Sequence, residues 1–385
     1  MEHGSFGKLD YSKQDNSMKQ KKLLILFWNL DIGGIQRIIR DLVIYLYRVH
    51  PNVKVYILIK HNKNSHLVEE IQQMSRATIC SPKHISNIRI VNQIYFFVWV
   101  AILYVRLSPD ICLTFLDTLS IFITGLHRLI FWKKVRIVLN EGVVTSKNNA
   151  INKHPVWLWN WAISFFYSHA DVIIVPSAAC RADLVSGLHI PARLVRIGRN
   201  WTLLDKKTSE RRIYDLIYVG RFEKEKNLPA LIELVKLLRL TNPRISLCFV
   251  GKGREETMLR KIVIHSRLQK NVIFAGYQPD VVSYINKSKI FVTTTRNEGV
   301  PLAILEAGSQ QIPCVTSRFL GSEEIIQHGK TGFIADTIQE MCLYIETLLK
   351  HSSLRKKIGH HAREFIRLRY GVPNVKMFVT YLLDI

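Results

Sequence analysis

The sequence alternates short, apolar, β-branched runs with segments long enough to form helices, and this alternation constrains the fold more than any other feature. Runs of this kind separated by helical segments are typical of a parallel sheet whose strands are joined by crossover helices. The sequence therefore predicts an α/β protein. The expected strands cover residues 23–28, 54–59, 111–116, 135–139 and 172–175 in the first half, and 216–219, 246–250, 272–274, 290–294 and 313–316 in the second.

The chain has 385 residues, which is too long for one ordinary hydrophobic core. The hydrophobic periodicity lapses after Asn200 and resumes at Leu216. We therefore predict two doubly wound, Rossmann-like domains that face each other across a central cleft. Their expected ranges are residues 21–205 and 206–371, with a disordered tail over 1–20 and a helix over 372–385 that packs back on the N-terminal domain.

Composition places the chain among folded globular proteins, with 48% hydrophobic and 22% charged residues. The six cysteines are far apart and form no Cys-x-x-Cys pair, so neither a zinc site nor a disulfide framework is indicated. The N-terminal residues are polar and contain no apolar signal core. We therefore expect a cytoplasmic protein.

The net charge of +24 predicts a phosphate-bearing partner. Anionic lipid head groups, lipid-linked diphosphates and nucleic acid all fit this charge. Nucleic acid is disfavoured because no helix-turn-helix, zinc or aromatic RNA-binding signature accompanies the charge. The apolar stretch 94–107 is shorter than the roughly 20 residues of a spanning helix, and it fits either a core helix or a face that contacts a bilayer.

The strongest functional signal is a strand-to-helix turn that follows the expected strand 290–294. Gly299 permits a sharp turn, and Pro301 suits the first position of a helix. The first free amides of that helix, from Leu302 and Ala303, would then point into a crevice at the carboxyl end of the strand. The helix dipole favours an anionic group such as a phosphate at this position.

Two carboxylates flank this turn, Glu298 on the loop and Glu306 inside the helix. Either one fits an ordinary charge that complements the helix dipole. A carboxylate beside a phosphate site also suits a second task, which is to accept hydrogen bonds from ribose or sugar hydroxyls. The combination indicates a nucleotide-sugar site.

Basic and glycine residues end two neighbouring strands of the second half. Arg221 and Lys226 follow the strand 216–219, and both could reach a diphosphate. Gly251 and Gly253 follow the next strand, where small residues would let a nucleotide base approach the backbone. Basic loop residues are usually solvent-facing, but their place at the same sheet edge as the Glu298 loop favours a binding role.

These motifs together resemble those of the group 1 (family 4) glycosyltransferases, a family of retaining enzymes with the GT-B fold of two facing Rossmann-like domains. The resemblance covers most of residues 213–335, and the pair Gly33-Gly34 with the strand order extends it more weakly over the first half. The matching strings are Gly220-Arg221-Phe222-x-x-Glu225-Lys226-Asn227, Phe249-Val-Gly251-x-Gly253, Asn297-Glu298-Gly299-x-Pro301-Leu302-x-x-Leu305-Glu306-Ala-Gly308 and Gly329-Lys-Thr-Gly332-Phe.

The resemblance implies roles for the donor site. Arg221 and Lys226 would hold the donor diphosphate and stabilise the leaving nucleoside diphosphate. Glu306 would bind the ribose hydroxyls, and Glu298 the donor sugar. The remaining donor-binding residues would be Gly34, Gly220, Gly251, Gly253, Gly299, Val300, Pro301 and Leu302.

On the acceptor side, the resemblance implies a flexible loop at Gly33 and Gly34, and we add Asn140 and Glu141 as candidate acceptor contacts. Many relatives carry a histidine after the strand that corresponds to residues 111–116, whereas this chain has Asp117 there. Asp117 is therefore the candidate base for the acceptor hydroxyl. No Asp-x-Asp motif occurs in the chain, so we expect a metal-independent reaction without a cofactor.

The expected function is retaining sugar transfer from a UDP- or GDP-sugar to a glycan or lipid-linked acceptor, in the assembly of cell-surface polysaccharide, lipopolysaccharide or glycolipid. We expect the enzyme to be peripheral on the anionic inner face of the cell membrane. A nucleotide-sugar epimerase or a sugar phosphate synthase of the same fold is the alternative. A basic nucleic-acid-binding protein is the alternative from another class.

Overall fold

The computed structural model describes residues 20–30, 33–61, 66–83, 85–129, 134–146, 155–203 and 211–385. The expected disordered tail, apart from residue 20, and the expected boundary at residues 205 and 206 lie outside these ranges. The chain divides into two compact units. The N-terminal unit comprises the described residues up to Arg199 together with Val375–Ile385, and the C-terminal unit comprises Asn200–Asn374.

The N-terminal unit is built on a seven-stranded sheet in the order β3-β2-β1-β4-β5-β6-β7, with every pair of neighbours parallel. The strand order reverses between β1 and β4. In open parallel sheets, ligands bind outside the carboxyl ends of the strands at such a switch point. The strands are β1 (Lys21–Asn29), β2 (Val53–His61), β3 (Thr78–Cys80), β4 (Ile111–Phe115), β5 (Arg136–Asn140), β6 (Val172–Val175) and β7 (Val195–Ile197).

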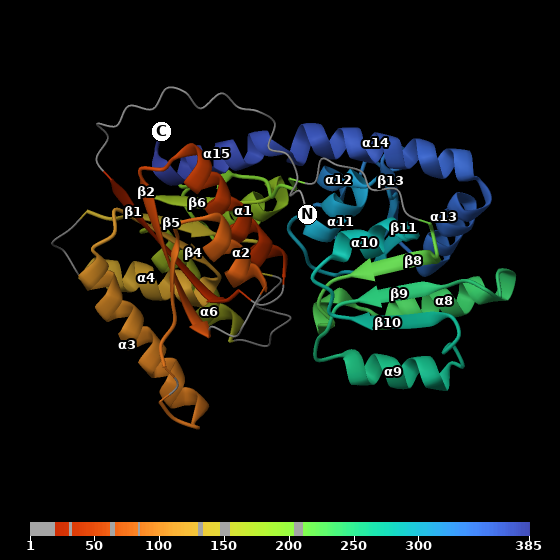
Figure 1. The fold of residues 1–385 in the computed structure, drawn as a ribbon, viewed down its shortest axis with the longest axis horizontal. Helices are drawn as coiled ribbons and strands as arrows, with labels where there is room; N and C mark the ends of the chain where they lie inside the picture. The colour runs from red at the N-terminus through yellow and green to blue at the C-terminus, as the bar shows by residue number, and fades with distance from the viewer. Residues whose placement is uncertain are drawn as a thin grey trace. The chain divides into compact units, whose positions relative to one another are not determined.

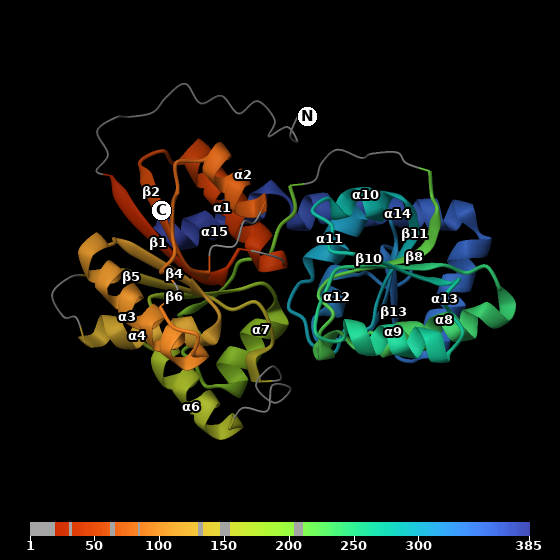
Figure 2. The same ribbon diagram turned by 60° about the horizontal axis from the view of Figure 1, so that its bottom comes forward.

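Helices cover both faces of this sheet (Figures 1 and 2). Helices α1 (Gly34–Val49) and α2 (His66–Met74) lie on one face. The other face shares one core cluster with the remaining crossover helices, because alternate strand residues such as Leu24, Cys112 and Ile173 point toward them. These helices are α3 (Arg89–Leu107), α4 (Asp117–Leu129), α6 (Val156–Tyr167) and α7 (Ala178–Ala182), with a π-helical turn over Asp183–Gly187.

The C-terminal helix α15 (Val372–Leu383) belongs mostly to the N-terminal unit. The ammonium of Lys21 donates to the carbonyl of Leu383 at 3.4 Å, and the guanidinium of Arg136 donates to the carbonyl of Tyr381 at 3.1 Å. These bonds hold the last turn of α15 against the strands β1 and β5.

The C-terminal unit is built on a six-stranded sheet in the order β10-β9-β8-β11-β12-β13, again with parallel neighbours. Its switch point lies between β8 and β11. The loops that follow these two strands are therefore at the position where an open parallel sheet binds ligands. The strands are β8 (Tyr214–Val219), β9 (Leu247–Val250), β10 (Val272–Gly276), β11 (Ser288–Thr293), β12 (Cys314–Ser317) and β13 (Gly332–Ala335).

This sheet also has a core on each face. Leu216 and Tyr218 point into one cluster with α8 (Pro229–Thr241), α9 (Glu256–His265) and α13 (Ile338–Lys350). Ile217 points into the other, with the remaining α-helices. Alternation along β8 thus supplies both cores. The second group is α10 (Val281–Asn286), α11 (Leu302–Ser309), α12 (Ser322–Ile325) and α14 (Ser352–Tyr370), and a 3₁₀ turn spans Lys224–Lys226.

Every strand named in the sequence analysis is present, with bounds shifted by no more than a few residues. Three further strands, β3, β7 and β13, lie at the edges of their sheets. Each contains only three or four residues. The strands β3 and β7 bury at most one residue each, so they leave little hydrophobic pattern in the sequence, and β13 begins with a glycine, which is uncommon in strands.

Candidate functional site

The loops after β8 and β11 are bonded to each other at the switch point of the C-terminal sheet. The hydroxyl of Thr294 donates to the carbonyl of Asn227 at 2.9 Å. The backbone amide of Arg296 donates to the carbonyl of Glu225 at 2.9 Å, and its guanidinium donates to the side-chain oxygen of Asn227 at 3.2 Å. These bonds hold the predicted basic loop and the predicted acidic loop side by side.

Lys226 and Glu298 meet across these two loops. The ammonium of Lys226 donates a hydrogen bond to Oε1 of Glu298 and forms an ion pair with it. The two side chains are only 12% and 19% exposed. The sequence analysis gave them separate tasks, on the diphosphate and on the sugar, and the structure places them in direct contact. The pair therefore joins a cation and an acceptor of hydrogen bonds in one sheltered position.

Arg221 stands in the same loop as Lys226 but is more accessible. Its side chain is 55% exposed, and its guanidinium lies 3.7 Å from the carboxylate of Glu225. An exposed pair at this distance contributes little and exchanges readily with another anion. The carbonyl of Arg221 accepts a hydrogen bond from the hydroxyl of Tyr218 at 3.1 Å, which anchors the backbone of this residue.

The glycines of the adjacent loops are required by the packing of the loops themselves. Gly251 has a φ of +140°, and a Cβ there would lie 1.9 Å from the carbonyl oxygen of Gly220. A Cβ on Gly253 would lie 2.3 Å from the carbonyl oxygen of Phe222. We had expected small residues here because a nucleotide base would approach the backbone. The structure adds a second reason, which is that the loop after β8 occupies the space.

The helix α11 begins at Leu302, and Pro301, which the sequence predicts at its first position, is its N-cap residue. The amide of Ile304 donates to the carbonyl of Pro301 at 3.1 Å, so the amides of Leu302 and Ala303 precede this first bond of the helix. Gly299 does not have a positive φ, and the turn therefore does not depend on the conformational freedom of glycine as we had expected.

Glu306 lies inside α11 and is buried, as is Val300 in the turn that precedes the helix. The carbonyl of Val300 accepts a hydrogen bond from the side-chain amide of Asn200 at 2.9 Å, which fixes the turn against the start of the unit. The predicted donor-site residues of the C-terminal unit thus gather on three adjacent loops and one helix start, all at the carboxyl edge of one sheet.

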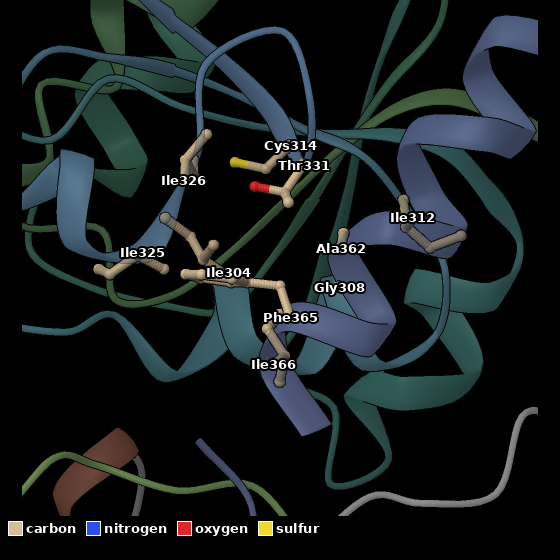
Figure 3. Close-up of a pocket in the computed structure, with 10 residues that line it drawn as sticks. All are labelled: Ile304, Gly308, Ile312, Cys314, Ile325, Ile326, Thr331, Ala362, Phe365 and Ile366. Carbon is tan, nitrogen blue, oxygen red and sulfur yellow. The ribbon is translucent and has the colours of Figure 1, made fainter. Parts of the chain in front are cut away.

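A small apolar pocket lies on another side of α11, between α12 and α14 (Figure 3). Ile304 and Gly308 line it from α11. Glu306 is two residues from each, which is about 200° around a helix, so its side chain projects away from this pocket. The pocket is therefore separate from the candidate donor site. Its other lining residues are Ile312, Cys314, Ile325, Ile326, Thr331, Ala362, Phe365 and Ile366.

In the N-terminal unit, Asp117 opens α4 directly after the switch-point strand β4. The preceding residue, Leu116, has a φ of +83°, which is an unusual conformation for a residue with a side chain and one that concentrates at functional sites. Oδ2 of Asp117 accepts a hydrogen bond from the indole nitrogen of Trp159 at 3.0 Å. The candidate base is therefore held in one orientation.

Asn140 and Glu141 end the neighbouring strand β5, and both are buried. The amide of Asn140 donates to the carbonyl of Ile174 at 3.3 Å. The carboxyl of Glu141 accepts a hydrogen bond from the hydroxyl of Tyr167 at 2.5 Å. Burial, with the nearby charge of Asp117, raises the pKa of Glu141 to about 8, although the Tyr167 hydrogen bond acts in the opposite direction.

The loop after β1 lies beside the loop after β5. A Cβ on Gly142 would lie 3.5 Å from the side chain of Ile35, which follows the predicted pair Gly33-Gly34. Gly33 has a φ of +149°, and Gly34 is exposed. Residues 31 and 32 of the same turn lie outside the described ranges. The structure thus gathers all four predicted acceptor-side residues at one sheet edge, together with Asp117.

Trp159 and Tyr167, which orient Asp117 and Glu141, are not predicted from the sequence. Both residues come from α6, a helix with an almost entirely apolar sequence. The one available signal is their spacing of eight residues, which places them on the same broad side of a helix. That spacing does not reveal which carboxylates they meet.

Known proteins resemble this chain in sequence. Residues 201–365 match the family model described as Glycosyl transferases group 1. The capsular polysaccharide biosynthesis glycosyltransferase CapM of Staphylococcus aureus is 27% identical over 157 residues, which is 40% of this chain and 41% of CapM. The N-acetylgalactosamine-N,N'-diacetylbacillosaminyl-diphospho-undecaprenol 4-alpha-N-acetylgalactosaminyltransferase of Campylobacter jejuni is 24% identical over 378 residues, 94% of this chain and 100% of that protein.

Solved structures resemble the chain in fold. The Anabaena protein HepE, solved in complex with UDP-glucose, superposes with a TM-score of 0.80 at 15% sequence identity. The superposition covers 94% of this chain and 99% of HepE. Together with the two parallel-sheet units, this likeness establishes the GT-B fold.

Proposed function

Because the chain belongs to the group 1 glycosyltransferases and has the GT-B fold, we propose that it transfers a hexose, with retention of configuration, from a UDP- or GDP-sugar to a glycan or lipid-linked acceptor. One observation carries the donor part of this proposal. Arg221, Lys226, Glu298 and the start of α11 converge on the switch point of the C-terminal sheet. That convergence combines positive charge, free helix amides and carboxylate acceptors, which are the groups that a nucleoside diphosphate sugar requires.

In the proposed mechanism, the donor diphosphate displaces Glu298 from Lys226 and accepts hydrogen bonds from the ammonium. Arg221 adds a bidentate contact, and the two cations stabilise the charge that develops on the leaving nucleoside diphosphate. Glu298, once released, accepts hydrogen bonds from the donor sugar. Glu306 accepts them from the ribose hydroxyls.

The N-terminal unit is proposed to bind the acceptor through Gly33 and Gly34, with Asn140 and Glu141 supporting the loop beside them. Asp117 takes the proton of the attacking hydroxyl, since Trp159 holds its carboxylate in place and leaves the second oxygen as an acceptor. The name of the Campylobacter relative includes a diphospho-undecaprenol, which supports a lipid-linked acceptor for this chain. We further propose that the enzyme works at the cytoplasmic membrane surface, in the assembly of a cell-surface glycan.

The test is a donor panel. Purified protein is incubated with individual UDP- and GDP-sugars, and release of nucleoside diphosphate is measured with and without candidate acceptors. We expect Arg221→Ala and Glu306→Ala to lower turnover by about 100-fold. Arg367→Ala, which removes an exposed ion pair with Glu364 on α14, is the matched control. If either variant keeps full turnover, the assignment of that residue to the donor site is wrong.

The same assay separates the alternative reactions of this fold. A sugar phosphate synthase would join the sugar to a sugar phosphate, and an epimerase would release an altered nucleotide sugar or free sugar without an acceptor. Mass and NMR analysis of the products identifies which of these reactions occurs. A product in which the glycosidic bond has the opposite anomeric configuration to the donor would contradict retention.

A further inference from the structure

Helix α3 is apolar on two opposite sides, and only one of them meets the core. Phe96, Val100 and Tyr104 repeat every four residues and are buried against the sheet. A second stripe with almost the same period faces away from them, and its side chains are between 39% and 70% exposed. The members of this second stripe are Ile90, Ile94, Val98, Ile102 and Val105.

Helix α6 carries a second set of exposed apolar side chains, Trp157, Trp161 and Phe165, again one turn apart. The rings of Trp161 and Phe165 stack with their centroids 5.6 Å apart. Leu129, at the end of α4, is also exposed. We name the α3 stripe, these three residues and Leu129 the apolar face.

Both helices belong to one layer, with α4 between them. Phe97 of α3 packs on Phe122 of α4 with ring centroids 4.7 Å apart. A Cβ on Gly125, one turn further along α4, would lie 3.0 Å from Phe166 of α6. Figures 1 and 2 show the three helices on the same side of the N-terminal sheet. The apolar face is therefore the outer surface of a single layer, whose inner surface is the core.

The charge around this face matches an anionic surface. Neither α3 nor α6 contains an Asp or Glu residue. Arg106 at the end of α3 and Arg128 at the end of α4 are exposed, and the guanidinium of Arg128 lies 5.7 Å from the ring centre of Phe165. Tryptophan is enriched where membrane and water meet, and basic residues beside it attract anionic head groups. A second copy of the chain would bring like charges together in a symmetric contact, which is unfavourable.

The geometry favours a helix that lies on a bilayer over one that crosses it. The 18 residues Ile90–Leu107 have a mean hydropathy of 1.7 and are 22% buried, so by length and composition they could span a membrane. Their inner side, however, is fixed to the sheet through Phe96, Val100 and Tyr104. A helix held in this way exposes one side to lipid, as interfacial helices do.

We propose that the apolar face docks the N-terminal unit onto an anionic phospholipid bilayer, with the α3 stripe and the α6 aromatics immersed at the level of the head groups. The docking itself does not require the proposed reaction. Docking would also bring the acceptor-side residues, which belong to the same unit, close to a lipid-linked acceptor. This consequence rests on the proposed function.

The first test is flotation of the full chain with vesicles of phosphatidylcholine alone or mixed with phosphatidylglycerol, without donor or acceptor. Ile94→Glu with Ile102→Glu is compared with Leu240→Glu with Leu343→Glu, two exposed leucines on α8 and α13 of the C-terminal unit. We expect the wild type and the control to float with anionic vesicles. The bound fraction of the α3 variant should be about tenfold lower. Thermal melting verifies that both variants are folded. Equal binding by the two variants would overturn the proposal.

The second test locates the inserted side chains. Bromine-labelled lipids quench tryptophan emission at the depth of the label, and we expect vesicle-bound protein to be quenched. Trp157→Phe with Trp161→Phe should remove most of that quenching while binding persists. Quenching that is unchanged in this variant would overturn the insertion of α6.

Two outcomes assign the face differently. If sedimentation without lipid shows a dimer, and the α3 variant is monomeric, then the apolar face is an interface with a second copy of the chain. This result would overturn bilayer docking. Vesicle binding that persists in a protein without any sugar transfer would leave the docking surface in place and reject the proposed function. The two proposals therefore fail separately.

Discussion

Lys226 and Glu298, which are 72 residues apart in the sequence, form an ion pair that joins the loops after β8 and β11. Each residue compensates the charge of the other. A donor that carries both a diphosphate and sugar hydroxyls offers each of them a new partner. In the proposed mechanism the donor replaces this contact, so the pair compensates two sheltered charges before the donor binds.

Lys226→Met should lower kcat/KM for the donor by about 100- to 1,000-fold, because the diphosphate loses a charged hydrogen-bond donor. Glu298→Gln should lower it less, by about 10-fold, since an amide still accepts one hydrogen bond. Calorimetry with UDP or GDP separates the two, because the proposed mechanism assigns the lysine to the diphosphate and the glutamate to the sugar. UDP and GDP affinities unchanged in Lys226→Met would contradict the assignment.

Asp117→Asn should lower kcat by about 100-fold or more and leave the affinity for UDP or GDP unchanged. The asparagine oxygen can still accept the hydrogen bond from Trp159, so the change removes basicity with little effect on geometry. Trp159→Phe tests orientation and should cost less than the loss of the carboxylate. Wild-type turnover by Asp117→Asn would show that another group takes the proton.

Glu141→Gln should change how stability depends on pH. The pKa of Glu141 is raised to about 8 from 4.5, so the folded state binds a proton that the unfolded state releases as pH rises between these values. The wild type therefore loses stability across that window, and the variant should lose less, by on the order of 4 kcal/mol at pH 8. Urea unfolding at pH 5 and pH 8 measures the difference. Parallel losses in the two proteins would contradict the raised pKa.

Gly251→Ala should destabilise the C-terminal unit by about 2 kcal/mol or more, because its Cβ would overlap the carbonyl of Gly220 and its φ is positive. The matched control is Gly329→Ala, which also has a positive φ but has open space around the added carbon. Thermal melting of the two variants separates overlap from backbone strain. Equal losses would show that the loop contact is unimportant.

Chelation should leave turnover unchanged, since the proposed mechanism assigns the positive charge for the leaving diphosphate to Arg221 and Lys226. EDTA-treated protein, assayed with and without added Mg²⁺ or Mn²⁺, provides the measurement. A loss of activity that Mg²⁺ or Mn²⁺ restores would contradict the metal-independent mechanism. Arg221→Ala should not gain activity from Mg²⁺ in the same assay.

The positions of the strands and of the turns that follow them could be predicted because they depend on local patterns. The run before Gly220 and the run before Asn297 are apolar and short, and parallel strands bring their carboxyl ends to one edge. That rule alone brings Arg221 and Glu298 to the same edge. The edge strands β3 and β7 escaped prediction because each has three residues, of which at most one is buried, and β13 because it begins with a glycine.

The sequence by itself determined the α/β class, the two repeated sheets and the residues at the ends of their strands, since periodicity and turn residues act over a few positions. Tertiary structure decided which charges touch and which apolar sides are covered. The contact of Lys226 with Glu298, and the burial of Glu141 against Tyr167, depend on loops and helices that are distant in sequence. Helix α3 is the clearest case, because a helix that is apolar on two opposite sides has no pattern to indicate which side packs on the sheet and which remains exposed.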